Sequence, residues 1–138
     1  MDKLSQKILA EFENIEEILN EMPLHTKLPF LSPLELAGVA AYLHSFYNGI
    51  ENILKQIFIS IKLTVPNGNS WHKELLEKAV QNEIITEKCK LNLGQYLAFR
   101  HYFSHAYSLD LFPERMATLV EYSKTVFDEF KNNIKKYS

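Results

Sequence analysis

The chain has 138 residues, of which 46% are hydrophobic and 23% are charged, and its formal net charge at pH 7 is -2. This length suits a single domain with a substantial core, residues 1–138, and the composition is ordinary for a soluble globular protein. The slight acidity excludes a basic surface spread over the whole molecule, so any contact with nucleic acid must be local or must be built by assembling two copies.

The N-terminal half of the chain is dominated by two predicted helices. Residues 3–22 place apolar side chains three or four positions apart, which predicts a helix with one apolar face. Ser32, Pro33 and Glu35 then combine a capping box with proline at the first helical position, and predict the start of a long helix over residues 33–63. Its apolar stripe is wide enough for two neighbours, so we expect this helix to be central, or to face another subunit as well.

Three further helices are expected in the C-terminal half. Residues 65–70 form a turn by composition, and Ser70 is expected to cap a helix that begins at Trp71. A second helix follows a link near Thr86, and a third begins at about Glu114. Because no alternating strand pattern occurs, the sequence predicts an all-α fold, an antiparallel four- to five-helix up-and-down bundle.

The cellular compartment is predicted from the one cysteine and from the lack of apolar runs. Cys89 has no second cysteine with which to form a disulfide within the chain, as is typical of a reducing compartment. The first residues lead into an amphipathic stretch rather than an apolar signal core, and no apolar run approaches the roughly 20 residues of a membrane span. We therefore expect a cytoplasmic protein without membrane contact.

The segment 99–107 concentrates residues that can carry chemistry. It contains Arg100, two histidines and Tyr107, and the whole chain has only one other arginine, Arg115. A guanidinium group can hold a phosphate bidentately, and an imidazole can transfer protons near neutral pH. Together these groups are the minimum needed to cleave RNA without a metal ion.

The pattern Arg-x4-His-x-Tyr, with a polar residue after the arginine, resembles the HEPN ribonucleases and more closely the HepT-like toxins of HEPN/MNT toxin–antitoxin pairs. Residues 46–55 and 70–76 are similar to the second-helix stretch and the third-helix opening of that family. The resemblance implies a metal-independent endoribonuclease without a cofactor, active as a homodimer in which two motifs face each other. It also implies a partner, an MntA-like minimal nucleotidyltransferase antitoxin that silences the toxin by attaching AMP to the motif tyrosine, here Tyr107.

The resemblance and the chemistry assign roles within the motif. His105 serves as base or acid when the RNA 2'-hydroxyl attacks the phosphorus, and Arg100 stabilises the charge that grows on the non-bridging oxygens. His101 could orient the phosphate or His105, and Tyr107 could contact the phosphate or stack on a base. His101 stands where the family has asparagine, which leaves the proton-transfer assignment between His101 and His105 open.

The spacing of the motif sets conditions on its geometry. At about 100° per residue, Arg100 and His105 would leave a regular helix about 140° apart, so either the helix ends between them or a second copy completes the site. His101 and His105 also have the spacing of helical metal ligands. Two ligands do not make a site, and no clustered cysteine or glutamate completes one, so we predict no metal centre.

Several residues have plainer interpretations. Arg100 could form an ion pair with a neighbouring helix, and His72 is expected to be a surface residue at a helix start. Glu51 either approaches the motif, where it would hold Arg100 or a histidine, or points at water beside Lys55. Two alternative functions stay open: a non-catalytic HEPN scaffold that presents a substrate to a nucleotidyltransferase, and a helical dimerisation module.

Overall fold

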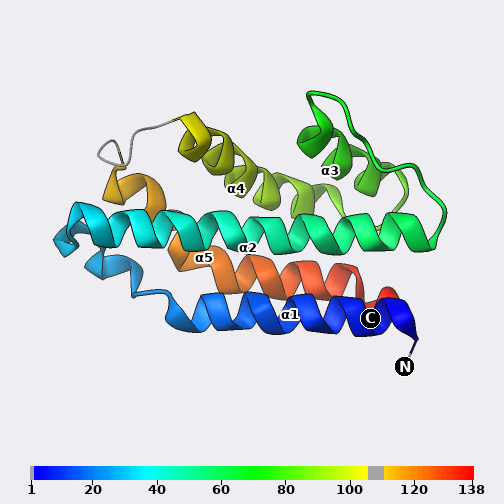
Figure 1. Ribbon diagram of the computed structural model, residues 1–138, viewed down its shortest axis with the longest axis horizontal. Coiled ribbons are helices and arrows are strands. Elements are labelled where there is room, and N and C mark those ends of the chain that lie inside the picture. Colours follow the sequence, from blue (N-terminus) through cyan, green and yellow to red (C-terminus); the bar gives the residue numbers. More distant parts are fainter. Residues whose placement is uncertain (1, 106–110) are drawn as a thin grey trace.

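The computed structural model describes residues 2–105 and 111–138, with only the backbone described for residues 104 and 105, and this part of the chain forms helices and no β-strand. Figure 1 shows four long helices that alternate in direction: α1 (Lys3–Glu21), α2 (Pro33–Ser60), α4 (Glu87–His105) and α5 (Pro113–Asn133). The shorter α3 (Trp71–Gln81) lies beside one end of α2, and two 3-10 segments, η1 (His25–Phe30) and η3 (Lys135–Tyr137), complete the described elements. The predicted all-α bundle is therefore confirmed. Within the described residues, no helix combines the length and the apolar character needed to cross a membrane.

Helix α2 is the central element of the bundle. It begins as predicted, because the Glu35 backbone N–H donates to Ser32 Oγ at 3.1 Å while the Ser32 backbone N–H donates to Glu35 Oε1 at 2.9 Å. The helix packs against α1, α3, α4 and α5. Its wide apolar stripe is buried against these neighbours of the same chain, so the stripe by itself does not call for a second copy.

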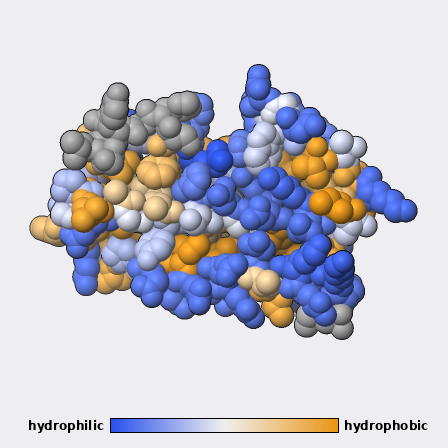
Figure 2. All heavy atoms as spheres, viewed as in Figure 1, coloured by the Kyte–Doolittle hydropathy of each residue, from blue (hydrophilic) through white to orange (hydrophobic). Residues whose placement is uncertain are grey.

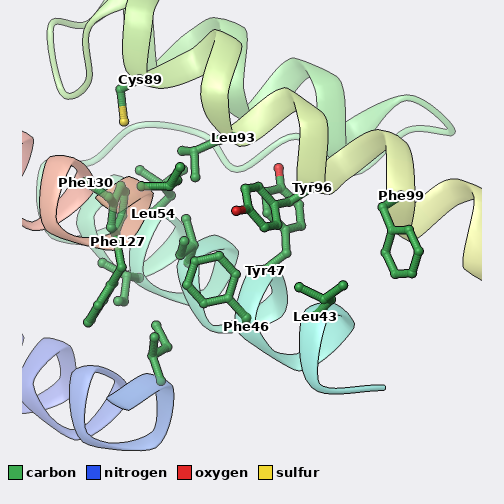
Figure 3. Close-up of a cluster of buried hydrophobic side chains, with 14 of the residues drawn as sticks. Leu43, Phe46, Tyr47, Leu54, Cys89, Leu93, Tyr96, Phe99, Phe127 and Phe130 are labelled. Carbon is green, nitrogen blue, oxygen red and sulfur yellow. The ribbon is translucent and has the colours of Figure 1, made fainter. Parts of the chain in front are cut away.

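The core surrounds α2 and takes buried side chains from all four neighbouring helices, and Figure 3 shows the part where α2, α4 and α5 meet. The ring of Phe46 packs edge-on against Tyr96, with 5.1 Å between centroids, and also contacts Phe127. The Tyr96 hydroxyl donates to the Leu119 carbonyl at 2.6 Å, which fixes α4 to α5. Burial in this core raises the pKa of the Cys89 thiol to about 12, so the thiol stays protonated at neutral pH.

The helices α3 and α4 begin in different ways. At α4, Thr86 is the capping residue, since its Oγ1 accepts from the Cys89 backbone N–H at 3.1 Å. Ser70 was expected to cap α3, and this expectation is wrong because its side chain makes no capping hydrogen bond. The physical reason is the backbone: Ser70 has φ -105° and ψ 25°, whereas a capping serine adopts an extended conformation.

Candidate functional site

Residues 99–105 of the motif lie on the last two turns of α4, and the backbone is helical through His105. The helix therefore does not end between Arg100 and His105, and that alternative is wrong. On an unbroken helix the two side chains leave the axis about 140° apart, so they do not converge from one copy of α4 alone. The side chain of His105 and the whole of Tyr107, the expected AMP acceptor, lie outside the described residues.

Arg100 occupies a half-buried position on α4, and its Nε atom is shielded from solvent. Its charge acts on two side chains of α2. It contributes to lowering the pKa of His44, after the larger effect of burial, and it partly opposes the upward shift of the Tyr47 pKa. Arg100 thus faces the central helix rather than open solvent. The neighbouring His101 is exposed and does not join this buried side of α4.

Three polar side chains of α2 lie on the face that receives Arg100. His44, Tyr47 and Glu51 are spaced i, i+3 and i+7, so they project within about 60° of one another. Tyr47 is fully buried and Glu51 is 1% exposed, in a helix face that is otherwise apolar. Figure 3 shows the Tyr47 side chain extending from α2 toward α4. Burial first, and then the negative charge of Glu51, raise the pKa of the Tyr47 phenol, so it stays protonated at any physiological pH.

The partner of Glu51 is His72, at the start of α3. His72 Nδ1 lies 2.7 Å from Glu51 Oε2, and the His72 side chain is 20% exposed. Glu51 was expected either to approach the motif and hold Arg100 or a histidine there, or to point at water. The histidine that it contacts is His72, which does not belong to the motif. The alternative that Glu51 points at water beside Lys55 is wrong, because Glu51 is buried and Lys55 Nζ lies 4.0 Å above the ring of Trp71.

His72 is one of the residues that sequence reasoning missed, since it was expected to be a surface residue. A signal was present: Glu51 is an acid in an apolar helix face, and a buried carboxylate requires a partner. The sequence alone could not say which basic side chain would supply it. The partner comes from a different helix, 21 positions away along the chain.

We call this group of five side chains the polar cluster: His44, Tyr47 and Glu51 of α2, His72 of α3 and Arg100 of α4. It joins one carboxylate to one guanidinium and two imidazoles. Figure 2 shows hydrophilic side chains gathered over the middle of the face in view, with the surface hollowed beside α3. Groups of this kind can bind an anion and can move protons. Within the described residues, no three His, Cys, Asp or Glu side chains are grouped so that they could hold a metal ion.

Comparison with known proteins identifies a family. The family model described as "HepT-like protein" matches residues 38–138, which include the whole polar cluster and the motif. A search of curated proteins gave no match to this chain. A search of solved structures likewise gave none.

Proposed function

The chain belongs to the HepT-like family of HEPN-type proteins, and on this premise we propose that it is the toxin of a toxin–antitoxin pair, a metal-independent endoribonuclease. The observation that carries the proposal is Arg100, which α4 holds near His44 and Tyr47 of α2 and on the same helix as His105. The guanidinium of Arg100 supplies a fixed positive charge, and His105 supplies an imidazole.

The reaction that suits these groups is cleavage by the neighbouring 2'-hydroxyl of the RNA. The hydroxyl oxygen attacks phosphorus, the bond to the 5'-oxygen breaks, and the products are a 2',3'-cyclic phosphate and a 5'-hydroxyl end. Arg100 stabilises the charge on the non-bridging oxygens in the transition state, and His105 transfers a proton. A homodimer would bring two motifs together, which the angle of about 140° between the two side chains favours.

Control of the activity is proposed to come from a nucleotidyltransferase antitoxin. It would bind the toxin and transfer AMP to Tyr107, which places a bulky anionic group two positions from His105. Added negative charge beside the phosphate site would repel RNA. Both components would act in the cytoplasm.

The test is cleavage of labelled RNA by purified protein in excess EDTA. We expect the wild type to cleave and to leave 2',3'-cyclic phosphate ends, and Arg100→Ala and His105→Ala to lose at least about 100-fold in rate. Arg115→Ala is the matched control, because Arg115 is the other arginine of the chain and is exposed on α5. An intact-mass measurement beforehand shows whether Tyr107 already carries AMP.

One observation favours a second candidate function, a non-catalytic scaffold that presents a substrate to the nucleotidyltransferase. The chain is slightly acidic, with 17 Asp and Glu residues against 15 Lys and Arg residues. A surface of this balance attracts RNA weakly outside a local site. If unmodified wild-type protein leaves RNA intact but binds its nucleotidyltransferase, the scaffold is the better description and the ribonuclease proposal is wrong.

A further inference from the structure

His44 is the member of the polar cluster for which neither the fold nor the motif provides a role. It is half-buried on α2, and its Nδ1 atom is buried without a hydrogen-bond partner among the described residues. Its ring contacts Phe103 of α4, with 5.7 Å between centroids. Because Phe103 follows Arg100 by one helical turn, this contact places His44 on the same side of α4 as the guanidinium. A buried polar atom without a partner calls for an explanation in a native structure.

The surroundings of His44 favour its neutral form. Burial lowers the pKa of this imidazole below its usual value, and the electrostatic effects of Arg100 and then of His72 lower it further. The remaining titratable groups of the cluster, Tyr47 and Glu51, lie on the same face of α2. A neutral imidazole at physiological pH is ready to accept a proton.

The proposed cleavage needs two proton transfers, one from the 2'-hydroxyl and one to the 5'-oxygen. Arginine cannot supply either, because its guanidinium stays charged. Among the histidines besides His105, His72 is engaged with Glu51 at 2.7 Å and His101 is exposed. His25 lies between α1 and α5, 4.0 Å from Glu121. His44 is the remaining imidazole, and it faces the same helix as the proposed phosphate-binding arginine.

We propose that His44 is a second proton-transfer group of this site and acts as the general base, an inference that rests on the proposed ribonuclease function. In the first proton transfer, the His44 imidazole takes the proton of the 2'-hydroxyl as the O2'–P bond forms. As the P–O5' bond breaks, protonated His105 gives its proton to the 5'-oxygen. Arg100 stabilises the charge on the non-bridging oxygens during both transfers.

The experiment compares two substrates, a normal oligoribonucleotide and one with sulfur in place of the bridging 5'-oxygen at one position. A thiolate leaves without a proton, so the sulfur substrate bypasses the general acid and still needs the general base. The variants are His44→Phe, which keeps a ring against Phe103, His44→Gln, which keeps a polar group, and His105→Ala. His25→Phe is the control for removal of a histidine, and thermal midpoints confirm that each variant is folded.

The expected result is a loss of at least about 100-fold in rate for both His44 variants on both substrates, whereas the deficit of His105→Ala largely disappears on the sulfur substrate. The rise of the wild-type rate with pH, which reports the base, should be absent from His44→Phe. If both folded His44 variants cleave at the wild-type rate, His44 is only a packing residue. The inference then fails, while the ribonuclease proposal stands. Rescue of His44→Phe by sulfur would overturn its assignment as the base. If the unmodified wild type cleaves neither substrate, the ribonuclease proposal itself fails.

Discussion

The pairing of Glu51 with His72 gives a prediction about stability that does not depend on any activity. The Glu51 side chain is 2% exposed, and His72 Nδ1 lies 2.7 Å from its Oε2 atom. Replacing His72 by alanine leaves the carboxylate buried without this partner, whereas Glu51→Gln removes the charge and leaves a half-buried imidazole. We therefore expect the two substitutions to differ in cost, although each breaks the same contact.

The magnitude follows from what each variant leaves behind. Removing one partner of a buried ion pair costs about 3–5 kcal/mol. The lower end of this range applies to His72→Ala for two reasons. The nearby Tyr47 hydroxyl can donate to the Glu51 carboxylate, and the place vacated by the His72 side chain is partly open to water. We expect about 3 kcal/mol, which for a domain of this size lowers the thermal midpoint by about 10 °C. Glu51→Gln keeps a polar group at the site and should cost about 1 kcal/mol.

Urea denaturation at pH 7.5 measures both free energies of unfolding, provided that the denaturant slopes agree. The double variant His72→Ala/Glu51→Gln should be more stable than His72→Ala alone, because it no longer buries a charge. His25→Ala is the matched control, since its contact with Glu121 is 4.0 Å long and part-exposed, and it should cost less than about 0.5 kcal/mol. A cost for His72→Ala no greater than that of Glu51→Gln would refute the reasoning.

Three further predictions concern the fold and the cluster. Gly38 of α2 has open space around it, so Gly38→Ala should raise the free energy of unfolding by about 0.5–1 kcal/mol. Gly49→Ala should be clearly less stable than Gly38→Ala, because a Cβ at position 49 would lie 2.8 Å from Ile15 Cγ1. Urea titration of the two variants gives the comparison. Lys62, two positions after the last residue of α2, has a left-handed backbone with φ 61°, which is strained for a residue other than glycine. Lys62→Gly should therefore raise the thermal midpoint, with a gain of about 1 kcal/mol in the free energy of unfolding. The pKa of His44 is lowered in the fold, so its neutral form contributes stability above the unfolded value of 6.5, and this stability is lost as pH falls from 6.5 toward the folded pKa. In urea titrations at pH 7.5 and 5.5, His44→Phe should therefore lose less stability than the wild type, and an equal loss would contradict this assignment.

Most of the fold could be predicted because its signals are local. The capping box of Ser32 and Glu35 and the apolar spacing within each helix involve residues at most a few positions apart, and the structure has α2 at Pro33–Ser60 where residues 33–63 were expected. Ser70 shows the limit of such signals. A serine before a helix caps it only if the backbone is extended there, and the turn at residues 65–70 sets that backbone differently.

The candidate site could be predicted only in part, because its members come from three helices. Arg100 was found from its motif, and Glu51 from its unusual position in an apolar face. His44 and His72 carry no local pattern. Their roles depend on how α3 and α4 lie across α2, and that arrangement is fixed by the whole core rather than by any one segment.

The polar cluster also bears on the strongest objection to a ribonuclease, the net charge of -2. Net charge averages over the surface, whereas a phosphate responds mainly to charges within about a Debye length of roughly 8–10 Å. Within the cluster, the carboxylate of Glu51 is directed at His72, 2.7 Å away, and α4 brings Arg100 to the same face. The balance of charge at this site therefore differs from that of the chain. A slightly acidic protein can still present a local site for a phosphodiester, and the few basic groups in it suit a substrate held at one phosphate rather than along a strand.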